Sequence, residues 1–149
     1  MHASVPMTRR VITIPPELPL ARAWKIFEQQ RIRHLPVVQA GALVGVLSDR
    51  DVLVRSSLVG TAVVAPDTSA GEALSPAPFV CNPDTDVADI VRTMTERKID
   101  AMPVVAGTTD RLVGLVTSTD LMLLLIQFDE ARPLPFDFEL EFHPHAASA

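Results

Sequence analysis

The chain has 149 residues, of which 48% are apolar and 21% are charged, and its formal net charge is −5. A chain of this length and composition can bury a substantial core, which excludes global disorder. The negative net charge argues against a protein that binds nucleic acid through phosphate contacts, because such proteins carry a basic face. We therefore expect no nucleic-acid partner.

The longest apolar run, residues 121–126, is far shorter than the roughly 20 residues that a membrane-spanning helix needs, so it predicts a buried helix and no membrane span. The first residues contain no apolar signal-peptide core. Cys81 is the only cysteine and cannot form an internal disulfide. Together these features favour a reducing, cytoplasmic location, with Cys81 as a small apolar packing residue.

The first part of the chain shows a helical pattern. Leu20, Trp24 and Phe27 recur at the spacing of one helical face, after a proline suited to the first helical turn. In the second half of the chain the corresponding positions are Val87, Val91 and Met94.

Short strands follow each helix. Pro36 ends the first helical pattern and precedes a β-branched pair, and after a turn a return strand spans residues 43–47. Pro103 and residues 112–116 have the same arrangement in the second half. With a short strand before each helix, each unit is predicted to run strand, helix, strand, strand, helix.

The two halves are copies of one unit. Residues 32–38 match 99–105 at a separation of 67, and residues 45–51 match 114–120 at a separation of 69. The two additional residues fall in a turn, where insertions are tolerated best. The predicted boundaries are 5–58 for the first unit, 59–71 for a linker, 72–128 for the second unit and 129–149 for an acidic, aromatic tail. In that tail Phe136, Phe138, Leu140 and Phe142 alternate with strand period, so a frayed tail and one docked on a neighbouring sheet remain alternatives.

A Gly-apolar-apolar-Ser/Thr-x-x-Asp pattern opens the last helix of each unit. Its polar residues are Ser48 and Asp51 in the first copy, and Thr117 and Asp120 in the second. This is the spacing of a capping box. A helix start also offers backbone N–H groups to an anion, and a carboxylate beside it can accept hydrogen bonds from sugar hydroxyls. From spacing alone, a helix cap and a ribose phosphate site are both possible.

The sequence resembles a known family through two segments. Arg-Ile-Arg-His-Leu-Pro-Val-Val at 31–38, followed by Leu-Val-Gly-Val-Leu-Ser-Asp-Arg-Asp-Val-Leu at 43–53, is similar to the bacterial CBS (cystathionine β-synthase) domain. The second copy repeats the pattern. The resemblance implies an α+β fold in which two β-α-β-β-α units pack about a pseudo-twofold axis as a Bateman module. It also implies two clefts that hold adenosine-containing ligands.

Carried over by position, the resemblance implies two ligand sites. In each site the Ser/Thr and Asp pair would contact phosphate and ribose, and the other residues would contact adenine. Plain core packing is the alternative role of the apolar members. The first predicted site comprises Ile12, Ile32, His34, Ser48, Arg50 and Asp51. The second predicted site comprises Phe79, Ile99, Ala101, Thr117 and Asp120.

The two copies differ in charge. The first copy has Arg33, His34 and Arg50. The equivalent residues of the second copy are Asp100, Ala101 and Thr119. Because a cation strengthens a hydrogen bond to phosphate, we expect the first site to bind phosphorylated ligands more tightly. Basic groups borrowed from across the interface, such as Arg9, Arg10 or Arg111, would alter this expectation.

The sequence offers no pattern of catalysis. Ser48 does not lie in a Gly-x-Ser-x-Gly turn, and His2, His34, His143 and His145 do not form a zinc-ligand spacing with the cysteine. We expect neither an enzyme nor a metal site, and no required cofactor.

Two functions remain. The chain is either a regulatory module that senses an adenine nucleotide of the AMP, ADP or ATP type, or a structural dimerisation module without a ligand. S-adenosylmethionine and NAD(H) are alternative ligands. In both cases we expect a homodimer, which is either a free-standing sensor or a subunit that contacts an unidentified regulated protein.

Overall fold

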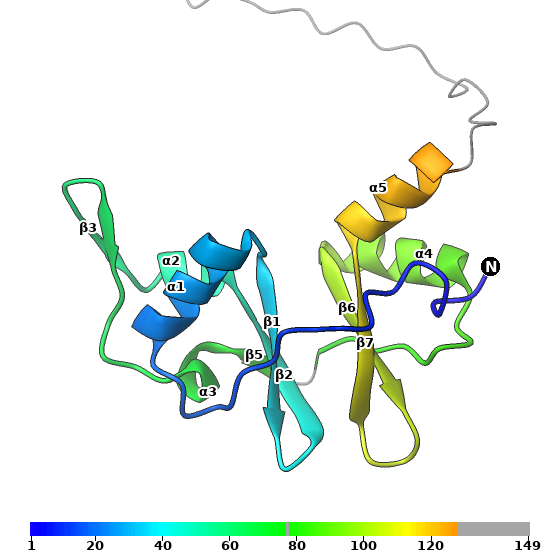
Figure 1. Ribbon diagram of the computed structural model, residues 1–149, viewed down its shortest axis with the longest axis horizontal. Helices are drawn as coiled ribbons and strands as arrows, with labels where there is room; N and C mark the ends of the chain where they lie inside the picture. The colour runs from blue at the N-terminus through cyan, green and yellow to red at the C-terminus, as the bar shows by residue number, and fades with distance from the viewer. Residues whose placement is uncertain (77, 128–149) are drawn as a thin grey trace, which may run out of the picture.

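The computed structural model describes residues 1–76 and 78–127 and shows two α+β units side by side (Figure 1). The predicted tail at 129–149 lies outside the described residues. The first unit contains α1 (Leu20–Gln30), β1 (His34–Gln39), β2 (Ala42–Ser48) and α2 (Asp49–Leu53). The second unit contains α4 (Val87–Arg97), β6 (Ala101–Ala106), β7 (Arg111–Thr117) and α5 (Ser118–Gln127). The chain between them forms β3 (Ser57–Val59), β4 (Ala62–Val64), α3 (Ala70–Ala73) and β5 (Ser75–Pro76).

The two longer amphipathic helices pack on their sheets through the faces that their apolar periodicity favours. Helix α1 buries Leu20 and Phe27, as predicted, and the predicted Trp24 is partly buried against the same core. Helix α4 buries Met94 together with Ile90, whereas the predicted Val91 is 43% exposed. Positions 90 and 91 both lie about one turn from either end of the predicted stripe, and only packing on the sheet decides between them.

Each unit is built on an antiparallel hairpin. Strands β1 and β2 pair from His34 with Ser48, and β6 and β7 pair from Ala101 with Thr117. The predicted first strand of each unit is reduced to one parallel bridge, which joins Ile14 to Val37 in the first unit and Cys81 to Val104 in the second. Prolines follow both segments closely and lack the N–H group that would extend a ladder.

Strands β2 and β7 join the hairpins through the pair Ala42 and Arg111. These residues are equivalent in the two copies, since they are 69 positions apart. The neighbouring bond, from the Leu43 N–H to the Asp110 carbonyl, measures 3.0 Å. Strand order is β1-β2-β7-β6, with β5 on β2. Because equivalent residues meet at the junction, the predicted pseudo-twofold arrangement of two α+β units is confirmed.

The units exchange the segments that precede their first bridges. The N–H of Thr8 donates to the Leu115 carbonyl at 2.9 Å, and Ala3 and Met7 are buried in the core of the second unit. Conversely, Ala70 and Ala73 of α3 are buried in the core of the first unit. The predicted boundaries follow chain order, whereas packing places residues 5–8 on the second unit and α3 on the first.

Two buried glycines allow this exchange. A Cβ at Gly45 would lie 2.5 Å from Leu74 Cδ1, and a Cβ at Gly114 would lie 2.7 Å from Met7 Sδ. Side chains essentially never approach so closely, so each exchanged segment needs a glycine in the strand that it crosses.

Helix α5 differs from its prediction. Of the apolar run at 121–126, only Leu124 is buried, whereas Met122, Leu123, Leu125 and Ile126 are exposed. Figure 1 shows the reason: α5 rises beyond the end of β7, where little of the sheet remains to cover it. Among the described residues, no helix has both the length and the apolar character needed to cross a membrane.

Candidate functional site

Two clefts lie where the units meet, and each has residues from both. The Ser48 cleft has a volume of about 520 Å³ and the Thr117 cleft about 360 Å³. The Ser48 cleft is lined by Ser48, Arg50 and Asp51 of the first unit and by Phe79, Ile99 and Ala101 of the second. The Thr117 cleft is lined by Ile12, Ile32 and His34 of the first unit and by Thr117, Thr119 and Asp120 of the second.

The structure groups the predicted site residues across the units, which corrects the grouping by copy. Ile12 and Ile32 lie with Thr117 and Asp120, and not with Ser48. His34 lines both clefts. For Ile12 the physical reason is the crossing of the chain, which pairs with the second unit at residue 8 and with the first unit at residue 14 (Figure 1).

A capped helix start stands on one wall of the Ser48 cleft. Asp51 Oδ2 accepts hydrogen bonds from the Ser48 N–H at 2.8 Å and from the Ser48 hydroxyl at 2.8 Å. The Ser48 hydroxyl in turn accepts from the Asp51 N–H at 3.1 Å. The capping box predicted from spacing is therefore present.

The Thr117 cleft repeats this cap with one addition. Asp120 Oδ2 accepts from the Thr117 N–H at 2.8 Å and from the Thr117 hydroxyl at 2.7 Å. Asp120 Oδ1 also accepts from the Thr8 hydroxyl at 3.3 Å. In both clefts the cap occupies Oδ2 of the carboxylate, and the second oxygen is the one placed to contact other groups.

The basic residues around the clefts differ from the sequence expectation. Arg10 and Arg31 line the Thr117 cleft, and Arg50 and Lys98 line the Ser48 cleft. Arg33 lines both. The expected loss of basic groups from the second site is therefore offset by arginines of the first unit, including Arg10.

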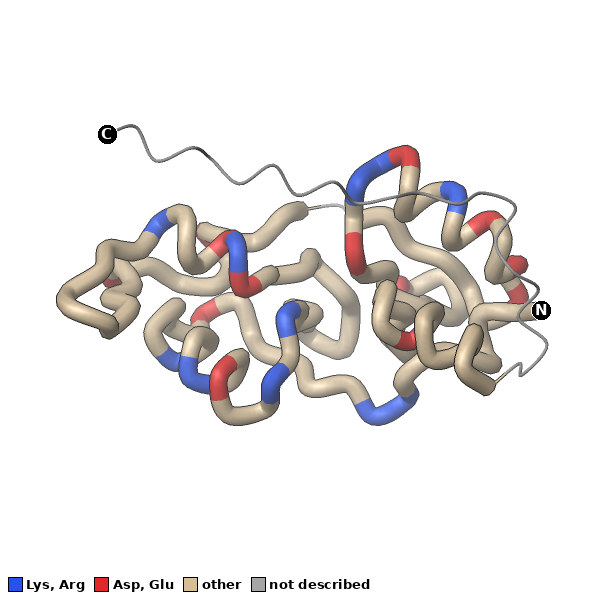
Figure 2. Tube along the Cα trace, turned by 90° about the horizontal axis from the view of Figure 1, so that it is seen from above, with Lys and Arg blue, Asp and Glu red and all other residues tan. Residues whose placement is uncertain are grey.

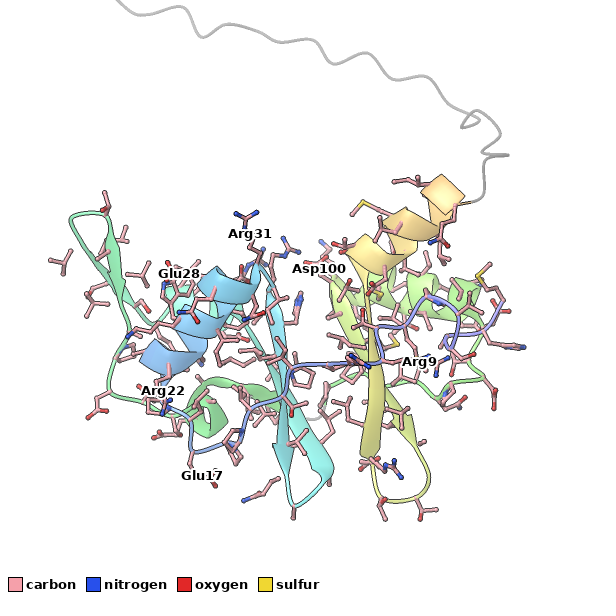
Figure 3. All side chains as sticks on the ribbon, viewed as in Figure 1. Arg9, Glu17, Arg22, Glu28, Arg31 and Asp100 are labelled. Carbon is pink, nitrogen blue, oxygen red and sulfur yellow. The ribbon has the colours of Figure 1, made fainter. Side chains whose placement is uncertain are left out.

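Sequence reasoning missed Arg31 and Lys98. Both follow an 11-residue helix, both have a left-handed φ of 53°, and they are 67 positions apart. Their equivalence, directly before the predicted adenine contacts at 32 and 99, was the available signal. Figure 3 shows Arg31 at the end of α1 and Asp100 on the same side of the molecule. Lysines and arginines elsewhere alternate with acidic residues over both units (Figure 2).

Comparison with known proteins identifies the family. The family model of the CBS domain matches residues 3–58 and again residues 70–127. The chain belongs to the CBS domain family.

Individual relatives agree with this assignment. This CBS pair is 30% identical over 115 residues to the CBS domain-containing protein YhcV of Bacillus subtilis, covering 77% of this chain and 79% of YhcV. Its fold is similar to that of a protein described as an acetoin utilization protein (AcuB) from Vibrio cholerae, with a TM-score of 0.72, 29% identity and coverage of 85% and 91%. It also resembles the CBS domain pair of MJ0100 in complex with 5'-methylthioadenosine and S-adenosyl-L-methionine, with a TM-score of 0.72, 25% identity and coverage of 85% and 97%.

The candidate adenine contacts of the CBS pair divide by exposure. Ile12 and Phe79 are 39% and 44% exposed, so core packing does not account for them. The Arg97 guanidinium lies 5.0 Å from the centre of the Phe79 ring, which holds that ring at the cleft. Ile32 and Ile99 are half-buried and pack against the two cores, so they serve packing as well as lining.

His34 is the one histidine of the predicted sites. Burial lowers its pKa below the ordinary value of 6.5, and the neighbouring Arg33 lowers it further. The carboxylates of Asp100, Asp49 and Asp51 act in the opposite direction without overcoming burial. The imidazole is therefore mainly neutral at pH 7 and adds little positive charge to the clefts.

Within residues 1–76 and 78–127, no cluster of three or more His, Cys, Asp or Glu side chains has the geometry to hold a metal ion. Cys81 is buried, and burial raises its thiol pKa to about 11. A thiol with so high a pKa is a poor nucleophile at neutral pH.

Proposed function

We propose that this CBS pair is a regulatory module that binds an adenosine-containing ligand in the clefts between its units and catalyses no reaction. The observation that carries the proposal is the composition of each cleft. Exposed apolar surface from one unit faces a capped Ser or Thr, a carboxylate and cations, which together suit a base, a ribose and a phosphate.

The structure supports a revised assignment of residues. In the Thr117 cleft, Ile12 and Ile32 would flank adenine, Asp120 would accept hydrogen bonds from ribose hydroxyls, and Arg10 and Arg31 would contact phosphate. In the Ser48 cleft the corresponding residues are Phe79, Ile99, Ala101, Asp51, Arg50 and Lys98.

The expected order of affinities changes with this assignment. The Thr117 cleft combines Arg10, Arg31 and Arg33 with two carboxylates, of Asp100 and Asp120. The Ser48 cleft also has three cations, but three carboxylates line it, those of Asp49, Asp51 and Asp100. The charge balance therefore favours the Thr117 cleft for phosphorylated ligands, which reverses the order expected from sequence.

The ligands of a related CBS pair support an adenosine-containing ligand. The MJ0100 pair holds two adenosine compounds, 5'-methylthioadenosine and S-adenosyl-L-methionine. Adenosine is the part that these compounds share with AMP, ATP and NADH. The module therefore has a testable ligand class, while the choice of substituent depends on the cations of each cleft.

Calorimetric and thermal-shift titrations with AMP, ATP, NADH and S-adenosylmethionine test the proposal. A ligand at a hundredfold excess over its Kd should stabilise the fold by about 2.7 kcal/mol. Asp120→Ala should remove one binding event and Asp51→Ala the other, whereas Glu17→Ala, outside both clefts, should remove neither. No stabilisation by any of these compounds at millimolar concentration would reject the proposal.

A structural dimerisation module is the second candidate function, and α5 favours it. Its exposed Met122, Leu123, Leu125 and Ile126 form an apolar surface that a second copy could cover. Sedimentation at micromolar concentration should show a homodimer, and Leu125→Gln with Ile126→Gln should shift it toward monomer. A wild-type chain that sediments as a monomer would contradict dimerisation.

A further inference from the structure

Arg33 and Asp100 form an ion pair between the two clefts. They are equivalent residues of the two copies, 67 positions apart, and their charged groups approach to 3.5 Å. Both residues line the Ser48 cleft and the Thr117 cleft. Their side chains are 61% and 54% exposed, so neither is locked in place by burial. The pair therefore stands where a change in one cleft reaches the other.

We propose that Arg33 is a cation shared by the two clefts and that it makes the binding of two phosphorylated ligands antagonistic. This inference rests on the proposed function. One guanidinium cannot bind closely to two phosphates at once. When the first phosphorylated ligand binds Arg33, the second ligand loses this hydrogen-bond donor. Each cleft also has cations that line it alone, Arg10 and Arg31 in the Thr117 cleft and Arg50 and Lys98 in the Ser48 cleft. The second ligand therefore binds more weakly but still binds.

Asp100 adds to the antagonism. In the unliganded CBS pair its carboxylate is balanced by Arg33. When Arg33 turns to a phosphate, Asp100 keeps its negative charge beside the cleft that is still empty. The second phosphorylated ligand thus meets the negative charge of Asp100 without the positive charge of Arg33, a net loss of one positive charge.

The antagonism concerns charge, because the wall that the two clefts share contains the charged side chains of Arg33 and Asp100. An adenosine compound without phosphate makes no demand on Arg33 and should bind the second cleft undisturbed. Mixed occupancy, with one phosphorylated and one uncharged ligand, is therefore favoured over two phosphorylated ligands. Such a module would report the ratio of two ligands in addition to the amount of one.

Calorimetry at low salt, where screening is weak, tests this with AMP and adenosine as probes. Asp51→Asn and Asp120→Asn give the association constant of each cleft with the other disabled, and their product is the overall constant for independent clefts. For AMP, the wild-type overall constant should be about three- to tenfold below that product. For adenosine it should equal the product. Melting curves establish that each variant is folded.

Arg33→Gln, measured alone and combined with each cleft variant, should remove the deficit for AMP. Arg111→Gln changes an exposed arginine near the axis that lines neither cleft, and it should leave the deficit intact. A deficit that persists in Arg33→Gln, or no deficit in the wild type, would overturn the antagonism alone. Failure of both AMP and adenosine to bind the wild-type chain would overturn the proposed function and the antagonism together.

Discussion

The Ser48 cleft and the Thr117 cleft stand on equivalent elements of the two units and differ in the side chains that line them. Each stands on a capped helix start, and each faces a segment that crosses from the opposite unit. Yet Asp120 accepts an additional hydrogen bond from Thr8, and Arg50 of one cleft has Thr119 as its counterpart. Pseudo-twofold symmetry thus preserves the framework, and a few substitutions at equivalent positions give the two clefts different lining side chains.

The largest expected effect on stability comes from the side chains that pack each exchanged segment on the opposite unit. Met7 is 8% exposed in the core of the second unit, so Met7→Ala should lower the free energy of unfolding by about 2–5 kcal/mol. Its equivalent, Leu74, is only partly buried, and Leu74→Ala should cost less. Urea denaturation measures both. Val5→Ala, in the same segment but exposed, is the control, and an equal loss from Val5→Ala would contradict the anchoring role.

The two buried glycines should respond unequally to a methyl group. A Cβ at Gly45 would lie 2.8 Å from the Ser75 carbonyl oxygen, whereas a Cβ at Gly114 would lie 3.1 Å from the Thr8 carbonyl oxygen. Gly45→Ala should destabilise the fold by about 1–3 kcal/mol. Gly114→Ala should cost less, because the Met7 side chain can move aside. Thermal unfolding of the two variants measures both losses of stability. A larger loss from Gly114→Ala than from Gly45→Ala would show that the packing around Gly45 adjusts more easily to a methyl group.

The helix caps provide a smaller effect. Ser48→Ala should destabilise by about 1 kcal/mol, since the Asp51 N–H loses its acceptor. Thr117→Ala should cost somewhat less, because its hydroxyl lies 3.3 Å from the Asp120 N–H and Thr8 still holds the carboxylate. Denaturant titrations test the pair. Combining Thr117→Ala with Thr8→Val should bring the loss up to that of Ser48→Ala, and no further loss in the double variant would exclude this role of Thr8.

The smallest effect concerns His34, whose equivalent in the second unit is Ala101. Because its pKa is lowered in the folded state, the unfolded chain binds the proton first as pH falls. Stability should therefore decrease as the pH falls through the ordinary pKa of 6.5 and on through the lower folded value. Melting temperatures of wild type and His34→Gln should diverge over this range, with the variant less dependent on pH. Identical pH profiles would show that the pKa of His34 is not lowered in the folded protein.

Much of the fold could be predicted because its signals are local or repeated. The separations of 67 and 69 residues identified the two units, their element order and both helix starts. The buried side of α4 was predicted only in part, because Ile90 and Val91 are both compatible with the periodicity. The exposure of α5 was missed, because an apolar run does not indicate how much sheet remains to cover it.

The sequence by itself determined that two equivalent units exist and which residues open their final helices, since a cap depends on residues three positions apart. Only the tertiary structure decided which residues share a cleft. Thr8 and Asp120 are separated by 112 positions, and Arg33 and Asp100 by 67. Such contacts follow from where the crossing segments pack around the pseudo-twofold axis. That packing depends on the volumes of buried side chains such as Met7 and on the space above Gly114, which no local pattern encodes.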